Sequence, residues 1–286
     1  IISFDRDRQI AMLSYYFRES VECDRECISD KIIIDLGAAN IYIWMAYTIY
    51  DDFLDNEGDP KMLSVANVCL REFTAIYKNI IKDNADFALV FDRVMDTLDS
   101  ANAWEVANCR ALVVDSIFYI PEVMPDYGDF SKLAERSLAH ALGPIAILHI
   151  IGYKGVQADV NNLLDFFKHY LVARQLNDDA HDWEEDLRNG HIDSVVSEIL
   201  KKVKNLKTLN IENDIKKLQK DFWFEIISEI SEKVIENIEI SKKYLKKVQI
   251  VKNKGLLEQF LNTTENSAKT AIKEQKQAMD FLKTYK

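Results

Sequence analysis

Three aspartates stand close together at the end of the apolar stretch that begins at Ile32. Asp51 and Asp55 are four residues apart, so they would share one face of a helix, with Asp52 beside them. Like charges at this spacing repel each other, and the C-terminal end of a helix disfavours anions. Because two unfavourable effects coincide, we expect a cation to bind this cluster.

A second acidic cluster lies in the segment 174–190. Asp178, Asp182 and Asp186 follow one another at intervals of four, and Asp179 is next to the first. Each step of four residues turns about 40° around a helix axis, so these carboxylates would form a slowly drifting stripe. The apolar segment LLDFFKHYLVA precedes them. The sequence therefore predicts the same arrangement twice, an apolar helix that ends in stacked carboxylates.

Oxygen ligands of this kind suit Mg²⁺, which keeps several waters and is usually held by one or two carboxylates together with substrate phosphates. We predict that Mg²⁺ binds these carboxylates, with Mn²⁺ as an alternative. Ca²⁺ is disfavoured because the EF-hand spacing is absent. The competing interpretation is two solvated helix ends, but neither cluster has a Lys or Arg four residues later to compensate it. The predicted metal ligands are Asp51, Asp52, Asp55, Asp178, Asp179, Asp182 and Asp186.

The implied ligand is amphipathic, with a phosphate head for the metals and a hydrocarbon tail for an apolar pocket. Arg174 and Arg188 flank the second cluster and could bind phosphate in a bidentate manner, although intrahelical ion pairs explain them equally well. Aromatic and hydroxyl side chains precede each cluster by one to three helical turns, and they either line the pocket or fill the core: Trp44, Tyr47, Thr48, Phe167 and Tyr170.

Helical periodicity runs through almost the whole chain. Its 286 residues include only 8 Gly and 4 Pro, which favours long helices over many strands and turns. We expect helices at about 8–20, 30–55, 60–82, 86–120, 129–152, 156–188, 192–204, 212–250 and 254–284, with a kink at Pro144 and no convincing strand. The predicted fold is a single all-α domain over 1–286, on which the helices after about 205 also pack. A separate C-terminal helical hairpin is the alternative.

The composition limits the classes of binding partner and the cellular location that we expect for the protein. A net charge of -11 argues against nucleic acid, which needs clustered Lys and Arg. The four cysteines form no CxxC pair and favour reduced thiols in a cytoplasmic protein. The run from Ile32 to Tyr50 is nearly long enough to span a bilayer, but Asp35 and Asn40 within it favour a buried helix over a transmembrane span. The sequence leaves a homodimer open.

The two acidic clusters resemble motifs of the class I isoprenoid synthase superfamily. DDFLD (51–55) resembles its first aspartate-rich motif. QLNDDAHD (175–182) resembles the second motif of trans-prenyl diphosphate synthases, in which Gln175, Asp178, Asp179 and Asp182 match. The longer QLNDDAHDWEEDLRNGH (175–191) is similar to the squalene/phytoene synthase signature. Asp178, Asp182 and Asp186 can also be laid on the metal-binding triad of terpene synthases.

The resemblance implies the isoprenoid synthase fold, an all-α bundle around a central apolar cavity. It also implies a cluster of about two or three Mg²⁺ ions that binds a prenyl diphosphate and triggers loss of the diphosphate. It also makes Gln175 a substrate contact and makes Asp51, Asp52, Asp55, Asp178 and Asp182 catalytic. The paired arginines typical of chain-elongating members are absent, since only Lys61 and Arg71 follow the first motif. We therefore expect a terpene synthase that ionises one allylic diphosphate. The alternatives are head-to-head condensation of the squalene/phytoene type, elongation with isopentenyl diphosphate, and a non-catalytic helical isoprenoid-binding protein.

Overall fold

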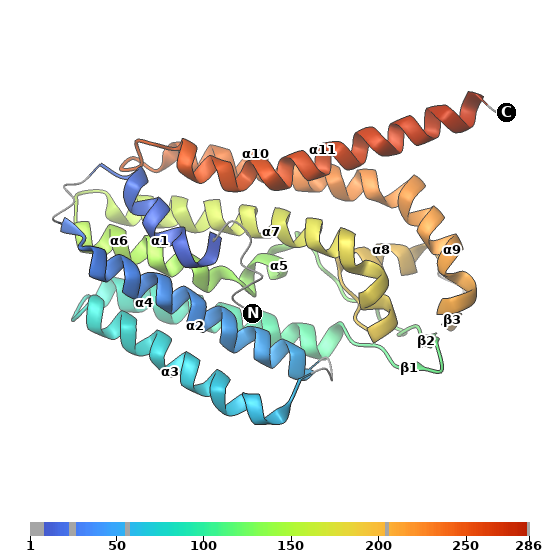
Figure 1. Cartoon of the computed structure of the whole chain (residues 1–286), viewed down its shortest axis with the longest axis horizontal. Coiled ribbons are helices and arrows are strands. Elements are labelled where there is room, and N and C mark those ends of the chain that lie inside the picture. Colours follow the sequence, from blue (N-terminus) through green and yellow to red (C-terminus); the bar gives the residue numbers. More distant parts are fainter. Residues whose placement is uncertain (1–8, 23–26, 55–57, 204–205, 285–286) are drawn as a thin grey trace. The chain divides into compact units, whose positions relative to one another are not determined.

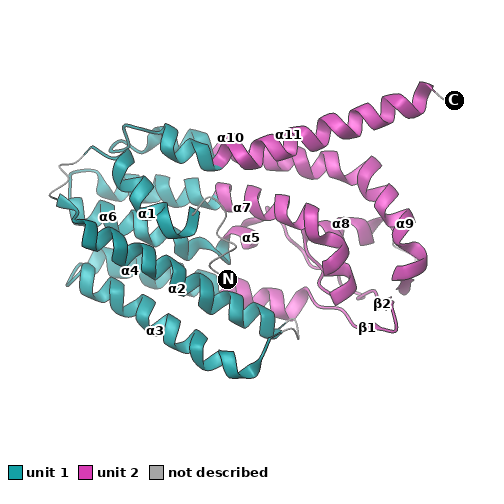
Figure 2. Ribbon diagram, in the orientation of Figure 1, with its two compact units in different colours: residues 1–99, 135–168, 241–260 teal, residues 100–134, 169–240, 261–286 magenta. Residues whose placement is uncertain are grey.

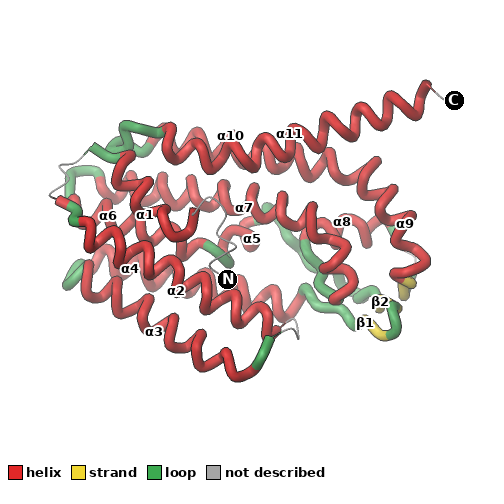
Figure 3. The backbone as a smooth tube through the Cα atoms, viewed as in Figure 1, coloured by secondary structure: helices red, strands yellow, loops and turns green. Residues whose placement is uncertain are grey.

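We describe residues 9–22, 27–54, 58–203 and 206–284 of a computed structural model of the protein (Figure 1). Helices dominate these residues (Figure 3), which confirms the prediction of an all-α protein. Contacts divide the chain into two compact units (Figure 2). Unit 1 comprises 1–99, 135–168 and 241–260, and unit 2 comprises 100–134, 169–240 and 261–286. That the chain forms a single domain stays a prediction.

Unit 1 is built on the apolar helix α2 (Asp30–Leu54), which lies beside α3 (Leu63–Ile80) as an antiparallel pair (Figure 1). Leu36, Ile43 and Ala46 recur at helical spacing on α2 and are almost fully buried. The other elements with residues in this unit are α1 (Gln9–Ser20), η4 (Pro60–Met62), α4 (Ala85–Asn108), α5 (Ser131–Glu135), η5 (Leu138–Ala141), α6 (Leu142–Ile151), α7 (Val156–Asn189), α10 (Ile227–Lys247) and α11 (Gly255–Thr284).

The segment 249–253 ties distant parts of unit 1 together. The buried carboxylate of Asp159 accepts hydrogen bonds from the backbone N–H groups of Gln249 and Ile250, and from the hydroxyl of Tyr153. The N–H of Lys252 donates to the carbonyl of Ser20, 2.9 Å away. A buried carboxylate needs such donors to offset its desolvation.

Unit 2 contains the remaining parts of α4, α5, α7, α10 and α11, together with α8 (Ser194–Lys202), α9 (Ile211–Asp221) and the π-helix η6 (Phe222–Ile226). Three short strands form an antiparallel sheet in the order β1-β2-β3: β1 (Val113–Val114), β2 (Ile117–Tyr119) and β3 (Thr208–Asn210). The helix expected at 86–120 was therefore wrong beyond Asn108, as was the expectation of no strands. Asp115 and Ser116 both have positive φ, as a two-residue hairpin turn requires, and buried Phe118 pairs with Leu209.

Pro144 does not kink a helix, which corrects a second expectation. α6 begins at Leu142, so Pro144 lies in its first turn, where the missing N–H would have had no partner in the helix. The helix expected at 129–152 is instead the succession α5, η5 and α6.

By length and composition, α2 could cross a membrane, but 44% of its most apolar window is buried inside the protein. It is the one such helix among the described residues, and no clear transmembrane span is indicated.

Candidate functional site

The first acidic cluster stands on the last turn of α2, in unit 1. Asp51 is half-buried, Asp52 is exposed, and Asp55 lies outside the described residues. Arg136 forms an ion pair with Asp51. The Nη2 of Arg136 donates to both carboxylate oxygens of Asp51, to Oδ1 at 2.9 Å and to Oδ2 at 3.1 Å. An arginine that holds a carboxylate in this way has the chemistry to bind phosphate oxygens as well.

The aromatic residues predicted to precede Asp51 lie on the same helix, one to two turns earlier. The hydroxyl of Tyr47 donates a short hydrogen bond to Asp99 of α4, and the hydroxyl of Tyr50 donates to Asn67 of α3 at 2.8 Å. Burial, followed by the contact with Asp99, raises the pKa of Tyr47 well above its usual range. Trp44 and Thr48 are half-buried, so part of each side chain stays accessible.

Gly58 brings the chain back against the end of α2. Its N–H donates to the carbonyl of Asp52 at 2.7 Å. A Cβ at position 58 would lie 2.6 Å from the backbone nitrogen of Phe53, closer than packing permits. The return of the chain after the first cluster therefore requires a residue without a side chain.

The second cluster lies along the final turns of α7, in unit 2. Asp178 is half-exposed and has the guanidinium Nε of Arg174 at 3.8 Å, while Asp182 is exposed one turn later. Burial raises the pKa of Asp178 and Arg174 opposes that effect, whereas the charge of Asp182 raises the pKa further. Because Asp178 and Asp182 are four residues apart on α7, they lie on the same face of the helix. Tyr170 is buried two turns before Asp178, with its pKa raised by burial.

Asp179 points into the protein instead. It is 4% exposed and accepts hydrogen bonds from the side-chain amide of Gln175 at 2.8 Å, and from both the hydroxyl and the N–H of Ser194. Burial raises the pKa of Asp179 to about 6, although the bonds from Ser194 and Gln175 act in the opposite direction. Asp179 therefore fixes α7 to the start of α8, whose N-cap is the neighbouring Asp193.

Asp186 is likewise directed at protein partners. Its Oδ1 lies 3.3 Å from Nδ1 of His191, and Nε2 of the same ring lies 3.2 Å from Oε1 of Glu105 on α4. Burial alone would lower the pKa of His191, but the bonds to Asp186 and Glu105 outweigh burial and raise it to about 9. The turn before His191 passes close to another backbone, since a Cβ at Gly190 would lie 2.3 Å from the carbonyl of Ala111.

The predicted stripe of carboxylates thus divides into two functions. Asp178 and Asp182 face solvent together, and Asp179 and Asp186 hold the end of α7 in place. Of the other predicted contacts, Arg188 is exposed and Phe167 is buried against Phe166. The sequence reasoning missed Arg136, Glu105, His191 and Ser194. The series DSVVSE after Gly190 is a typical helix start and could have indicated the Ser194 junction.

Among the described residues, no group of three or more His, Cys, Asp or Glu side chains is arranged to hold a metal ion. The carboxylates of exposed Asp52 and Asp182 and of half-exposed Asp178 nevertheless suit Mg²⁺ in kind, because they offer only oxygen and remain open to water. In each unit these carboxylates could supply one or two ligands to a Mg²⁺ ion, and water and phosphate oxygens would complete its coordination.

Each unit contains a cavity. The cavity in unit 2 has a volume of about 520 Å³ and is lined by residues of α7, η6, α10 and α11, among them Asn177, His181 and Trp223. The cavity in unit 1 has a volume of about 670 Å³ and lies at the turn between α3 and α4, and no residue of the first cluster lines it.

No protein-family model matches the sequence, and a search of curated proteins finds no match. The function proposed below therefore depends on the chemistry of the residues themselves.

Proposed function

We propose that the protein is a Mg²⁺-dependent class I isoprenoid synthase that ionises an allylic prenyl diphosphate, and that it acts as a terpene synthase. One observation carries the proposal: two helices each have a pair of aspartates near the C-terminal end that is at least partly open to solvent. Asp51 and Asp52 lie in the last turn of α2, and Asp178 and Asp182 lie about three and two turns before the end of α7. The competing interpretation, a solvated helix end, does not require an arginine beside the aspartates. Arg136 nevertheless donates to both carboxylate oxygens of Asp51.

In the proposed reaction the protein binds the diphosphate and protects the carbocation. Asp52 in unit 1, and Asp178 with Asp182 in unit 2, would each supply ligands to Mg²⁺, which when bound supplies Lewis-acid neutralisation of the charge that develops on the leaving diphosphate. Arg136 can bind diphosphate oxygens in the same manner as it holds Asp51. Trp44 and Tyr47, one to two turns before Asp51, offer aromatic faces to a cation.

The substrate test uses geranyl, farnesyl and geranylgeranyl diphosphate, each with and without isopentenyl diphosphate and Mg²⁺. Released diphosphate and extracted hydrocarbons are measured. Terpenes formed from a single substrate support the proposal, whereas a longer diphosphate indicates elongation and a doubled hydrocarbon indicates head-to-head condensation. If no substrate turns over in the presence of metal, the proposal of an enzyme is wrong.

The residue test uses Asp52→Asn and Asp178→Asn, one change in each unit. Each should lower the rate of diphosphate release by about tenfold or more, because a metal ligand loses its charge. Glu72→Gln on α3 and Glu232→Gln on α10 remove an equal charge from exposed helix positions and serve as matched controls. Equal rates in all four variants would refute the assignment of the carboxylates.

A further inference from the structure

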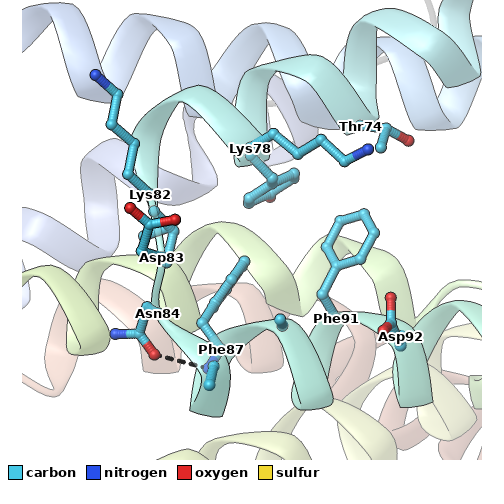
Figure 4. Close-up of a pocket in the computed structure, with 12 residues that line it drawn as sticks. Thr74, Lys78, Lys82, Asp83, Asn84, Phe87, Phe91 and Asp92 are labelled. Carbon is cyan, nitrogen blue, oxygen red and sulfur yellow. Dashed lines mark hydrogen bonds between the residues drawn. The ribbon is translucent and has the colours of Figure 1, made fainter.

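The cavity at the turn between α3 and α4 has the properties of a second ligand site in unit 1. Its volume of about 670 Å³ falls within the range of about 300–1,000 Å³ that small-molecule pockets occupy. The last turns of α3 form one side and the first turns of α4 form the other (Figure 4).

Aromatic rings make up the apolar part of the cavity. The ring of Tyr77 lies 5.7 Å from that of Phe87 and 5.5 Å from that of Phe91, measured between centroids. Tyr77 and Phe87 are nearly fully buried, while Phe91 is half-buried and presents part of its ring to the cavity. Phe91 therefore offers the accessible aromatic surface, and an aromatic group packed on it gains more than the contact area alone provides.

Two lysines stand on the rim above these rings. Lys78 lies in the last turn of α3, Lys82 lies in the turn after the helix, and both are exposed (Figure 4). Among the described residues, neither lysine makes a hydrogen bond or an ion pair. Asn84 is fixed at the same rim, because its Oδ1 accepts a hydrogen bond from the N–H of Phe87 at 2.9 Å. Its amide NH₂ can therefore donate to a ligand without losing this contact.

The charge of the rim limits the charge of the ligand. Asp83 and Asp92 also line the cavity, so the two lysines are matched by two carboxylates. A single negative group can sit beside the lysines, whereas a diphosphate with several charges would be repelled by the aspartates. The rim thus differs from the acidic helix ends, where a metal is needed before an anion can bind.

We propose that this cavity binds a small amphipathic monoanion, with an aromatic body against Phe87 and Phe91 and one carboxylate beside Lys78 and Lys82. The site is distinct from the one in the proposed function. The bond between Tyr50 and Asn67 places the start of α3 at the end of α2. At 1.5 Å per residue, Lys78 is about 16 Å further along α3 than Asn67.

The test compares 2-naphthoate with 2-naphthamide, a neutral molecule of nearly the same shape, by isothermal titration calorimetry. We expect naphthoate to bind the wild-type protein about tenfold more tightly than naphthamide. The Lys78→Ala/Lys82→Ala variant should lose about this factor for naphthoate and change little for naphthamide. Phe91→Ala should weaken both ligands, because the aromatic surface is reduced.

Lys243→Ala is the matched control, since Lys243 is an exposed lysine on α10 in the same unit. It should leave both affinities unchanged. Absence of naphthoate binding to the wild type, equal binding of the two ligands, or full binding by the lysine variant would each overturn the proposal. Release of diphosphate from a prenyl diphosphate should be unaffected in the lysine variant, so the outcome here is independent of the proposed enzyme activity.

Discussion

At the scale of single residues, Arg136 is the most informative addition to the first acidic cluster. Both oxygens of Asp51 accept hydrogen bonds from it, and no local pattern predicts the pair, since 85 positions separate the two residues. The aspartates were predictable because a helix of known period fixes their spacing. The arginine was not, because tertiary packing alone brings it there.

Replacement of Arg136 by alanine should reduce kcat/KM for diphosphate release by about tenfold or more, because a bidentate phosphate contact is lost. Arg136→Lys keeps the charge but not the fork of donors and should recover only part of the rate. The measurement is steady-state release of diphosphate. Arg71→Ala, an exposed arginine on α3, is the control. A rate for Arg136→Ala equal to that control would exclude Arg136 from substrate binding.

His191 makes the stability of the protein depend on pH. Its pKa is raised from 6.5 to about 9 by Asp186 and Glu105, against the effect of burial. Since the folded pKa is the higher one, the protonated ring stabilises the fold fully below pH 6.5, and this contribution is lost as the pH rises towards 9. A shift of this size corresponds to about 3 kcal/mol.

Urea unfolding between pH 6 and pH 9, in the presence of a chelator, measures this effect. The facing groups are Glu105 and Arg110 on the α4 side and Asp186 on α7. Glu105→Gln removes one charge that holds the proton on His191, so the loss of stability over this range should become smaller. His181→Gln, at an exposed position of α7, should leave it unchanged. Identical pH profiles for Glu105→Gln and wild type would contradict this account.

At the scale of elements, the junction of α7 with α8 holds the second cluster. Ser194→Ala removes the hydrogen bond from the serine hydroxyl to the buried carboxylate of Asp179. The hydrogen bond from the backbone N–H of residue 194 remains. The free energy of unfolding should still fall by about 1–3 kcal/mol, the usual result when a buried acceptor loses its donor. Chemical denaturation measures the change.

Ser197 provides a matched comparison on the same helix. Its hydroxyl is buried and has no hydrogen-bond partner among the described residues. Ser197→Ala should therefore be neutral or slightly stabilising. If the two serine variants are destabilised equally, the link between Asp179 and α8 does not stabilise this junction.

The helices were largely predictable, and the sheet was not. α2 and α7 follow from apolar periodicity and from Gly190, whose φ of +78° ends α7 where the sequence indicated. These signals are local. The local sequence around Phe118 predicts a helix, but the residues form a strand that pairs with Leu209. This partner lies far away in the sequence, so no local pattern indicates the pairing. Pro144 was misjudged because the start of α6 depends on packing.

At the scale of the whole molecule, the fold and the metal should be separable. Among the described residues no metal cluster joins elements, and the candidate ligands are exposed. A chelator should therefore abolish diphosphate release, while helix content by circular dichroism and the unfolding midpoint stay the same. Added Mg²⁺ should restore turnover. Unfolding by the chelator would reveal a structural metal, and turnover in its presence would exclude a metal-dependent reaction.

The closure of unit 1 by the segment 249–253 has a consequence for synthesis on the ribosome. Asp159 finds its backbone donors only after Gln249 and Ile250 have emerged. At about 5–20 residues per second, the nascent chain waits roughly 10 s between the two events. During this interval the carboxylate of Asp159 has the hydroxyl of Tyr153 as a donor but lacks its two backbone donors. Unit 1 thus completes its folding only when most of the chain has been made, although most of its residues come early.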